Sequence, residues 1–160
     1  MLGSLVDMPI LTKLTEFLDA HGVGYEIASP ARLVDAGAVQ VAKTVMIRAG
    51  YECLLAVTPR SSEVSLKRLA RITGYRRLRL ATDFEIKALA PGCHPGALPP
   101  FGHLNDLPVW IDTSLTPDGD IAFQVGSPEH IVRMRYADFV RLAQPRIASF
   151  HMDPGSPEDA

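Results

Sequence analysis

The chain has 160 residues, of which 47% are hydrophobic and 21% charged, and its net charge is −2. That length suits one domain with a real core, and the charge excludes a protein whose whole surface coats nucleic acid, though not a local basic patch. No signal-type start and no uncharged stretch of membrane-span length occurs, so we expect a cytoplasmic protein without a membrane partner. Cys53 and Cys93 lack Cys-x-x-Cys spacing, which favours free thiols.

The first half of the chain alternates short helical and strand-like segments. Apolar residues at helical spacing predict a helix over 9–21 that begins at Pro9. The other predicted elements are a strand at Tyr25–Ala28, a helical turn at Pro30–Asp35, two strands at Val39–Ala49 and Tyr51–Thr58 that form a hairpin about Gly50, and a helix at Ser65–Thr73 ended by Gly74.

The second half is mainly strands. A capping box of Thr82 and Glu85 predicts a helix to Leu89. The other predicted elements are strands at Arg77–Ala81, Val109–Asp112, Ile121–Val125 and Ile131–Arg135, and a helix at Tyr136–Leu142. Consecutive strands argue against a doubly wound parallel sheet. We therefore expect an α+β fold with a mixed, largely antiparallel sheet or barrel of six to seven strands and flanking helices. Residues 1–150 form the domain, and 151–160 are expected to be a disordered tail.

The segment Pro91–His103 holds four prolines and three glycines and no Lys, Arg, Asp or Glu. It cannot be a helix interior or a central strand, because proline lacks the backbone donor and fixes φ. One interpretation is the wall of a small-molecule pocket, since glycine allows close approach to the backbone. The other is an ordinary surface connection.

Familiar catalytic motifs are absent. The chain has no Gly-x-Ser-x-Gly, no His-Glu-x-x-His and no phosphate-binding loop that ends in Gly-Lys-Ser/Thr. Cys93, His94 and His103 fit no structural zinc spacing, so no metal and no cofactor is expected. Cys93 as a nucleophile lacks an identifiable base.

A basic stretch contains no carboxylate over thirteen residues. Its cations are Lys67, Arg68, Arg71, Arg76, Arg77 and Arg79. Such a concentration would give salt-dependent binding to a phosphate backbone. The alternative is a solvated helix face followed by the wet side of a strand.

Several segments together resemble the YbaK/ProX family. These segments are Val41-Ala42-Lys43-Thr44, where a lone lysine interrupts an apolar strand, Gly96-Ala97-Leu98-Pro99-Pro100 with Phe101-Gly102, Val109-Trp110-Ile111-Asp112, Phe123-Gln124-Val125-Gly126-Ser127 and Tyr136-Ala137-Asp138-Phe139. The family comprises aminoacyl-tRNA deacylases related to the editing domain of bacterial prolyl-tRNA synthetases. The resemblance extends over roughly residues 20–145.

The resemblance implies a free-standing trans-editing hydrolase that cleaves the ester of a mischarged aminoacyl-tRNA. Lys43 and Thr44 would be catalytic, with Lys43 placing charge on a phosphate or carbonyl oxygen and Thr44 orienting water or a ribose hydroxyl. Backbone N–H groups at Gly96 would hold the oxyanion. Substrate contacts are assigned to Gly96, Ala97, Leu98, Pro100, Phe101, Gly102, Gly126 and His130. The alternative for Lys43 is an edge lysine, and for His130 a turn residue without a role.

The implied partner is aminoacyl-tRNA rather than DNA, and an aminoacyl-tRNA synthetase is a further candidate partner. The basic stretch from Lys67 to Arg79 would bind the tRNA. Two other functions stay open: a non-catalytic RNA- or nucleotide-binding module of the same fold, and a Cys93-dependent small-molecule hydrolase. The sequence leaves the edited amino acid and its tRNA undetermined.

Overall fold

The structure is a computed structural model that describes residues 9–30 and 39–155. Its helices are α2 (Pro9–Ala20), α4 (Leu66–Thr73), α5 (Asp83–Leu89), α6 (Tyr136–Ala143) and the short 3-10 helix η1 (Gly102–Leu104). Its strands are β1 (Tyr25–Ala28), β2 (Val39–Ala49), β3 (Glu52–Pro59), β4 (Glu63–Val64), β5 (Arg79–Leu80), β6 (Val109–Asp112), β7 (Asp120–Gln124), β8 (Ile131–Arg135), β9 (Arg146–Ala148) and β10 (His151–Met152). The helical turn expected at Pro30–Asp35 falls almost entirely outside the described residues. None of the described helices has the length and apolar character that crossing a membrane requires.

The fold is α+β, as expected, and its main sheet is mixed and does not close into a barrel. The strand order is β1-β8-β7-β2-β3-β6-β9, with β5 paired to β2. Four pairs are antiparallel, namely β1–β8, β7–β8, β2–β3 and β2–β5. The pairs β2–β7, β3–β6 and β6–β9 are parallel.

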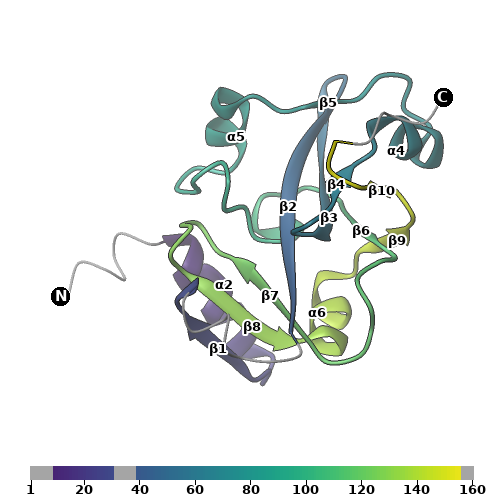
Figure 1. The fold of residues 1–160 in the computed structure, drawn as a ribbon. Helices are drawn as coiled ribbons and strands as arrows, with labels where there is room; N and C mark the ends of the chain where they lie inside the picture. Colours follow the sequence, from purple (N-terminus) through teal and green to yellow (C-terminus); the bar gives the residue numbers. More distant parts are fainter. Residues whose placement is uncertain (1–8, 31–38, 156–160) are drawn as a thin grey trace.

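Strand β2 connects the two halves of this sheet and runs the height of the molecule (Figure 1). Its first residues pair with β7, from Val39 to Val41, and its later residues pair with β3, from Ala42 to Ala49. Because side chains alternate along a strand, Ala42 and Met46 reach the main core while Val41 and Val45 pack on the other face. The point at which β2 changes partner is where the candidate site lies.

The main core lies between this sheet and helices α2 and α6. Leu14 and Leu18 of α2 are fully buried in it. Phe101, from the proline-rich segment, packs edge-on against Phe123 of β7 and Phe139 of α6, with ring centroids 5.7 Å and 5.4 Å apart. Aromatic contacts of this geometry stabilise a core beyond the area that they bury. The proline-rich segment is therefore partly a core element.

The local sequence signals for helix ends hold in the structure. Thr82 accepts a hydrogen bond from the Glu85 backbone, and the Glu85 side chain accepts one from the Thr82 backbone, which is the predicted capping box. Gly74 ends α4 with a left-handed φ of 83°.

The C-terminal residues stay in the fold past position 150. His151 and Met152 pair with β4, and the backbone N–H groups of Phe150 and His151 donate to Asp112 Oδ1 at 2.7 and 2.8 Å. The tail therefore does not begin at 151 as expected, because the fully buried carboxylate of Asp112 anchors these residues. Residues 156–160 lie outside the described residues.

Candidate functional site

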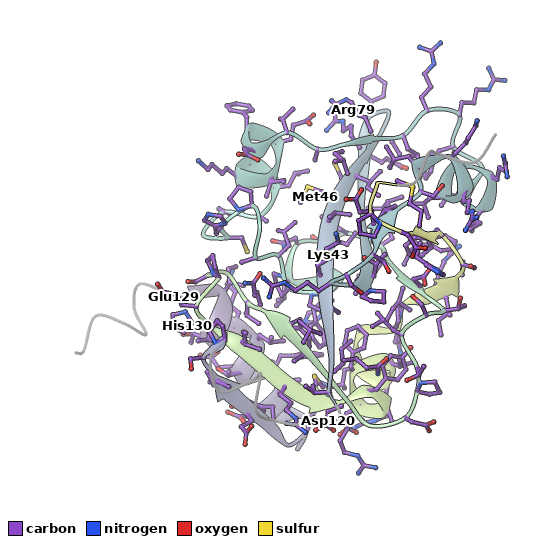
Figure 2. All side chains as sticks on the ribbon, viewed as in Figure 1. Lys43, Met46, Arg79, Asp120, Glu129 and His130 are labelled. Atoms are coloured by element: carbon purple, nitrogen blue, oxygen red, sulfur yellow. The ribbon has the colours of Figure 1, made fainter. Side chains whose placement is uncertain are left out.

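A cleft of about 310 Å³ opens where β2 passes from β7 to β3, and Figure 2 shows Lys43 midway along β2. Its lining brings together residues from β2, the turn after β3, the proline-rich segment, β7 and β8. They are Val41, Ala42, Lys43, Arg60, Gly96, Phe123, Gln124 and Ile131. Lys43 and Gly96, which sequence analysis placed in the site, do share one cleft.

The pairing register decides which neighbours Lys43 has. Lys43 lies opposite Thr58 of β3, and directly opposed residues of an antiparallel pair share a face. Thr44 points to the opposite face with the main core and is only 7% exposed. It does not line the cleft, so the structure gives no support to the expected role of Thr44 in orienting water. Thr58, which lies opposite Lys43, is fully buried and does not line the cleft either.

Gly96 is held in place by the turn that follows β7. The backbone N–H of His94 donates to Gly126 O at 2.9 Å, and the N–H of Gly126 donates to Ala97 O at 2.8 Å. Gly126 has a φ of 77°, a conformation that glycine adopts without strain. Both backbone groups of Gly126 are thus used to position the segment rather than to contact a ligand.

The backbone donors expected for an oxyanion are already occupied. The Gly96 N–H donates to His94 Nδ1 at 3.1 Å, and the Ala97 N–H donates to His94 O at 2.8 Å. The polar side chains among the cleft's lining residues are those of Lys43, Arg60 and Gln124, and Gln124 Nε2 already donates to Pro128 O at 3.0 Å. Lys43 and Arg60 are therefore the charged groups that line this cleft.

Most other residues assigned to the substrate from this segment are buried elsewhere. Ala97, Leu98 and Phe101 are 1%, 3% and 0% exposed, and Leu98 and Phe101 belong to the main core. Pro100 and Gly102 are buried as well, and a Cβ at Gly102 would lie 1.8 Å from Leu107 O. These five residues do not line the cleft. The apolar side chains that suggested a pocket wall fill the core instead.

His130 lies beside Glu129 at the start of β8, as Figure 2 shows. It is half-buried, and its Nδ1 has no hydrogen-bond partner among the described residues. Its neighbour Ile131 lines the cleft, but His130 does not. The structure therefore places His130 next to the cleft in sequence but not among its lining residues.

Arg60 is a cation of the cleft that sequence analysis missed. Its backbone N–H donates to Val41 O at 2.8 Å, which continues the β2–β3 register by one pair. Residue 60 therefore lies opposite residue 41 and diagonal to Lys43, on the same face. A hairpin centred on Gly50 implies this pairing, so the strand register is the signal from which Arg60 could have been predicted.

Part of the predicted basic stretch forms a separate, larger groove of about 780 Å³. Its basic lining residues are Arg48, Lys67, Arg76, Arg77 and Arg79. Arg48 was not predicted. Of the other predicted cations, Arg68 donates to His151 O at 3.0 Å, and neither it nor Arg71 lines the groove.

One carboxylate offsets the charge of this groove. Arg79 forms a two-pronged contact with Glu85 at 2.8 and 2.9 Å, and this contact lowers the pKa of Glu85 to about 2. Arg48 Nε lies 3.7 Å from the same carboxylate. Lys67, Arg76 and Arg77 are exposed and form no ion pair within the described residues. Because Arg48 and Arg79 share one carboxylate, the charge of these three residues and of one of that pair is left unbalanced in the groove.

Cys93 does not have the properties of a nucleophile. It is 5% exposed, and burial raises the pKa of its thiol to about 11, so it stays protonated near neutral pH. In the described part of the chain, no three His, Cys, Asp or Glu side chains come together in a way that could hold a metal ion.

Comparison with known proteins identifies the family to which this fold and cleft belong. The sequence profile of the aminoacyl-tRNA editing domain matches residues 21–142, which is most of the chain, so the chain belongs to that family. This confirms the resemblance found in the sequence.

Curated relatives agree over part of their length. The Multifunctional Ser/Thr-tRNA deacylase ProXp-y of Escherichia coli (strain K12) is 35% identical over 98 residues, which cover 61% of this chain and 58% of that protein. The protein of the same name from Escherichia coli O157:H7 matches to the same extent. The matched region thus spans little more than half of these relatives.

Solved structures share the fold. A crystal structure of a candidate trans-editing enzyme for prolyl tRNA synthetase superposes with a TM-score of 0.76 at 21% identity, covering 90% of this chain and 98% of that one. A crystal structure of a hypothetical protein superposes equally well, with a TM-score of 0.76 at 16% identity, covering 88% of this chain and 99% of that one.

Proposed function

We propose that the chain is a trans-editing hydrolase that deacylates mischarged aminoacyl-tRNA. The observation that carries this proposal is the convergence of Lys43 and Gly96, from distant parts of the sequence, on one cleft. Membership of the aminoacyl-tRNA editing domain family and the name of the curated relatives support the reaction class.

Hydrolysis of an aminoacyl ester requires few catalytic groups. A water oxygen attacks the acyl carbon, the bond from that carbon to the ribose oxygen breaks, and the proton of the water passes to the ribose oxygen. Positioning and charge stabilisation suffice for such an activated ester. Lys43, half-buried and without an ion pair among the described residues, is suited to stabilise the carbonyl oxygen as it gains charge.

In this proposal the basic groove binds the tRNA body. The reaction takes place in the cytoplasm, where synthetases release their products. A non-catalytic RNA-binding module would use the same groove, so turnover separates the two functions. The buried, high-pKa thiol of Cys93 gives no support to a thiol-dependent hydrolase.

The test is a deacylation panel with the intact protein. Seryl- and threonyl-tRNA come first because the curated relatives are named for them, and alanyl- and cysteinyl-tRNA complete the set. We expect multiple turnovers of at least one mischarged tRNA. We expect no hydrolysis when the same amino acid is attached to its cognate tRNA. Tight binding to tRNA without release of any amino acid would contradict the proposal and favour the binding module.

A further inference from the structure

Two cations share the cleft, and no carboxylate of the described residues balances either of them. Lys43 and Arg60 both line it, and neither forms an ion pair with any residue of 9–30 or 39–155. Like charges in one small cleft repel each other, and an anionic ligand relieves that repulsion. The cleft therefore favours a ligand that carries negative charge in addition to a polar ester.

The two cations differ in depth. Lys43 lies within the regular strand β2 and is half-buried, whereas Arg60 lies in the turn after β3 and is exposed. Arg60 also lines a second, adjoining cleft with Gln40 and Ser114, so it stands where the site opens outward. A guanidinium at a rim is well suited to grip a phosphate, since its planar fork matches two phosphate oxygens.

We propose that Arg60 binds the phosphate on the 5′ side of the terminal adenosine, which leaves Lys43 for the ester carbonyl. This inference rests on the proposed function and divides the work of the site. Arg60 recognises the nucleotide where the tRNA strand leaves the cleft, and Lys43 serves the reacting group. The hydrogen bond from the Arg60 backbone N–H to Val41 O fixes the backbone of Arg60 relative to β2.

The first test measures binding and does not require turnover. Adenosine 5′-monophosphate and adenosine are titrated by calorimetry against the wild-type protein, Arg60→Ala, Arg60→Lys and Arg135→Ala. Arg135 is a matched control because it is exposed and lies at the far end of β8, opposite Asp120. We expect the phosphate to tighten binding to wild type and to Arg135→Ala about ten- to hundredfold. Arg60→Ala should lose that preference, and Arg60→Lys should keep part of it.

The second test measures hydrolysis of two small aminoacyl esters, one of adenosine 5′-monophosphate and one of adenosine. Each ester carries the amino acid that the protein releases from tRNA in the deacylation panel. Arg60→Ala should lower kcat/KM about ten- to hundredfold for the phosphate-bearing ester alone. Lys43→Ala should slow both.

The outcomes separate the two proposals. No preference of the wild type for the monophosphate, or a preference that survives in Arg60→Ala, would overturn the assignment of Arg60. An equal loss on both esters in Arg60→Ala would overturn it too. Failure of the proposed function would appear instead as absent hydrolysis across the tRNA panel.

Discussion

At the scale of single residues, two glycines of the same segment are predicted to behave in opposite ways. A Cβ at Gly96 would meet only His94, at 3.5 Å, and Gly96 has no left-handed φ, so the fold tolerates a side chain there. A Cβ at Gly102 would collide with Leu107 O, which is backbone and cannot move away. Gly96 serves the cleft and Gly102 serves the packing.

We therefore expect folded Gly96→Val to lose at least about tenfold in kcat/KM, because its methyl groups narrow the cleft, while its melting temperature stays close to wild type. Gly102→Ala should instead lower the free energy of unfolding by about 1–3 kcal/mol or more through overpacking. Circular dichroism melts measure the stability of both variants, and single-turnover rates measure their activity. A Gly96→Val protein as active as wild type would remove Gly96 from the site.

Leu98 shows why side-chain roles in this segment were not predictable from sequence. An uncharged run of prolines and glycines indicates a rigid segment but not which side it presents to the core. The structure buries Leu98 at 3% exposure, so Leu98→Ala should destabilise the fold by about 2–5 kcal/mol rather than change the preferred amino acid.

At the scale of elements, the predicted strands were found, including the four-residue strands Tyr25–Ala28 and Val109–Asp112, whereas some shorter strands were not predicted. Strand β2 was predicted with its true bounds, and the capping box of Thr82 fixed the start of α5. Strands β4, β9 and β10 were missed because two or three residues carry no periodicity. The cleft was predicted in part. Lys43 was predicted from the lysine that interrupts an apolar strand. The place of Arg60 in the cleft depends on the strand register, and the position of Thr44 outside it depends on which face of β2 the side chain occupies.

The fully buried Asp112 connects β6 to the chain at the start of β10 and gives a prediction of its own. Burial raises the pKa of Asp112, but hydrogen bonds from Ser114 and from the Phe150 backbone N–H outweigh burial and leave the pKa below its usual value. His151 Nδ1 also lies 2.8 Å from Asp112 Oδ2. Asp112→Ala would leave the Phe150 N–H buried and unpaired and would remove the bonds from Ser114 and His151, at a cost on the order of 3 kcal/mol near pH 7.

The pH dependence follows from the sign of the shift. A carboxyl whose folded pKa is depressed stabilises the fold above its unfolded pKa of about 3.9, and that stability is lost as pH falls through the folded pKa. Urea denaturation from about pH 7 to about pH 3 should show this loss for wild type and for the exposed control Asp118→Ala. It should be smaller for Asp112→Ala. Parallel pH profiles for all three proteins would show that Asp112 does not anchor the C-terminal strand.

At the scale of the whole molecule, the basic groove and the Lys43 cleft lie at different points along β2. Arg48, in the groove, is five residues beyond Lys43, or about 16 Å along a strand. Figure 2 shows Arg79 at the end of the molecule opposite Asp120. This separation suits a substrate that places its reacting end in the cleft and its phosphate backbone in the groove.

Binding of tRNA should therefore weaken as salt rises, and reversal of Arg76 and Arg77 to glutamate should lower the log–log salt slope by about two. Both side chains are exposed and line the groove. The matched control reverses Arg135, which lies opposite Asp120 and thus away from Arg79. Filter binding across a salt series measures the slopes. Equal slopes for the double variant and wild type would mean that the groove is only solvated.

The most direct measurement is the deacylation rate of Lys43→Ala on the mischarged tRNA that the wild-type protein turns over. Lys43 is the cation within β2 that faces the cleft, and removing a group that stabilises the developing oxyanion costs about 10²–10³ in rate. We predict a loss of that size in kcat, with an unchanged melting temperature because the lysine is only half-buried. A folded Lys43→Ala protein that hydrolyses the ester at the wild-type rate would contradict the assignment of this cleft as the active site.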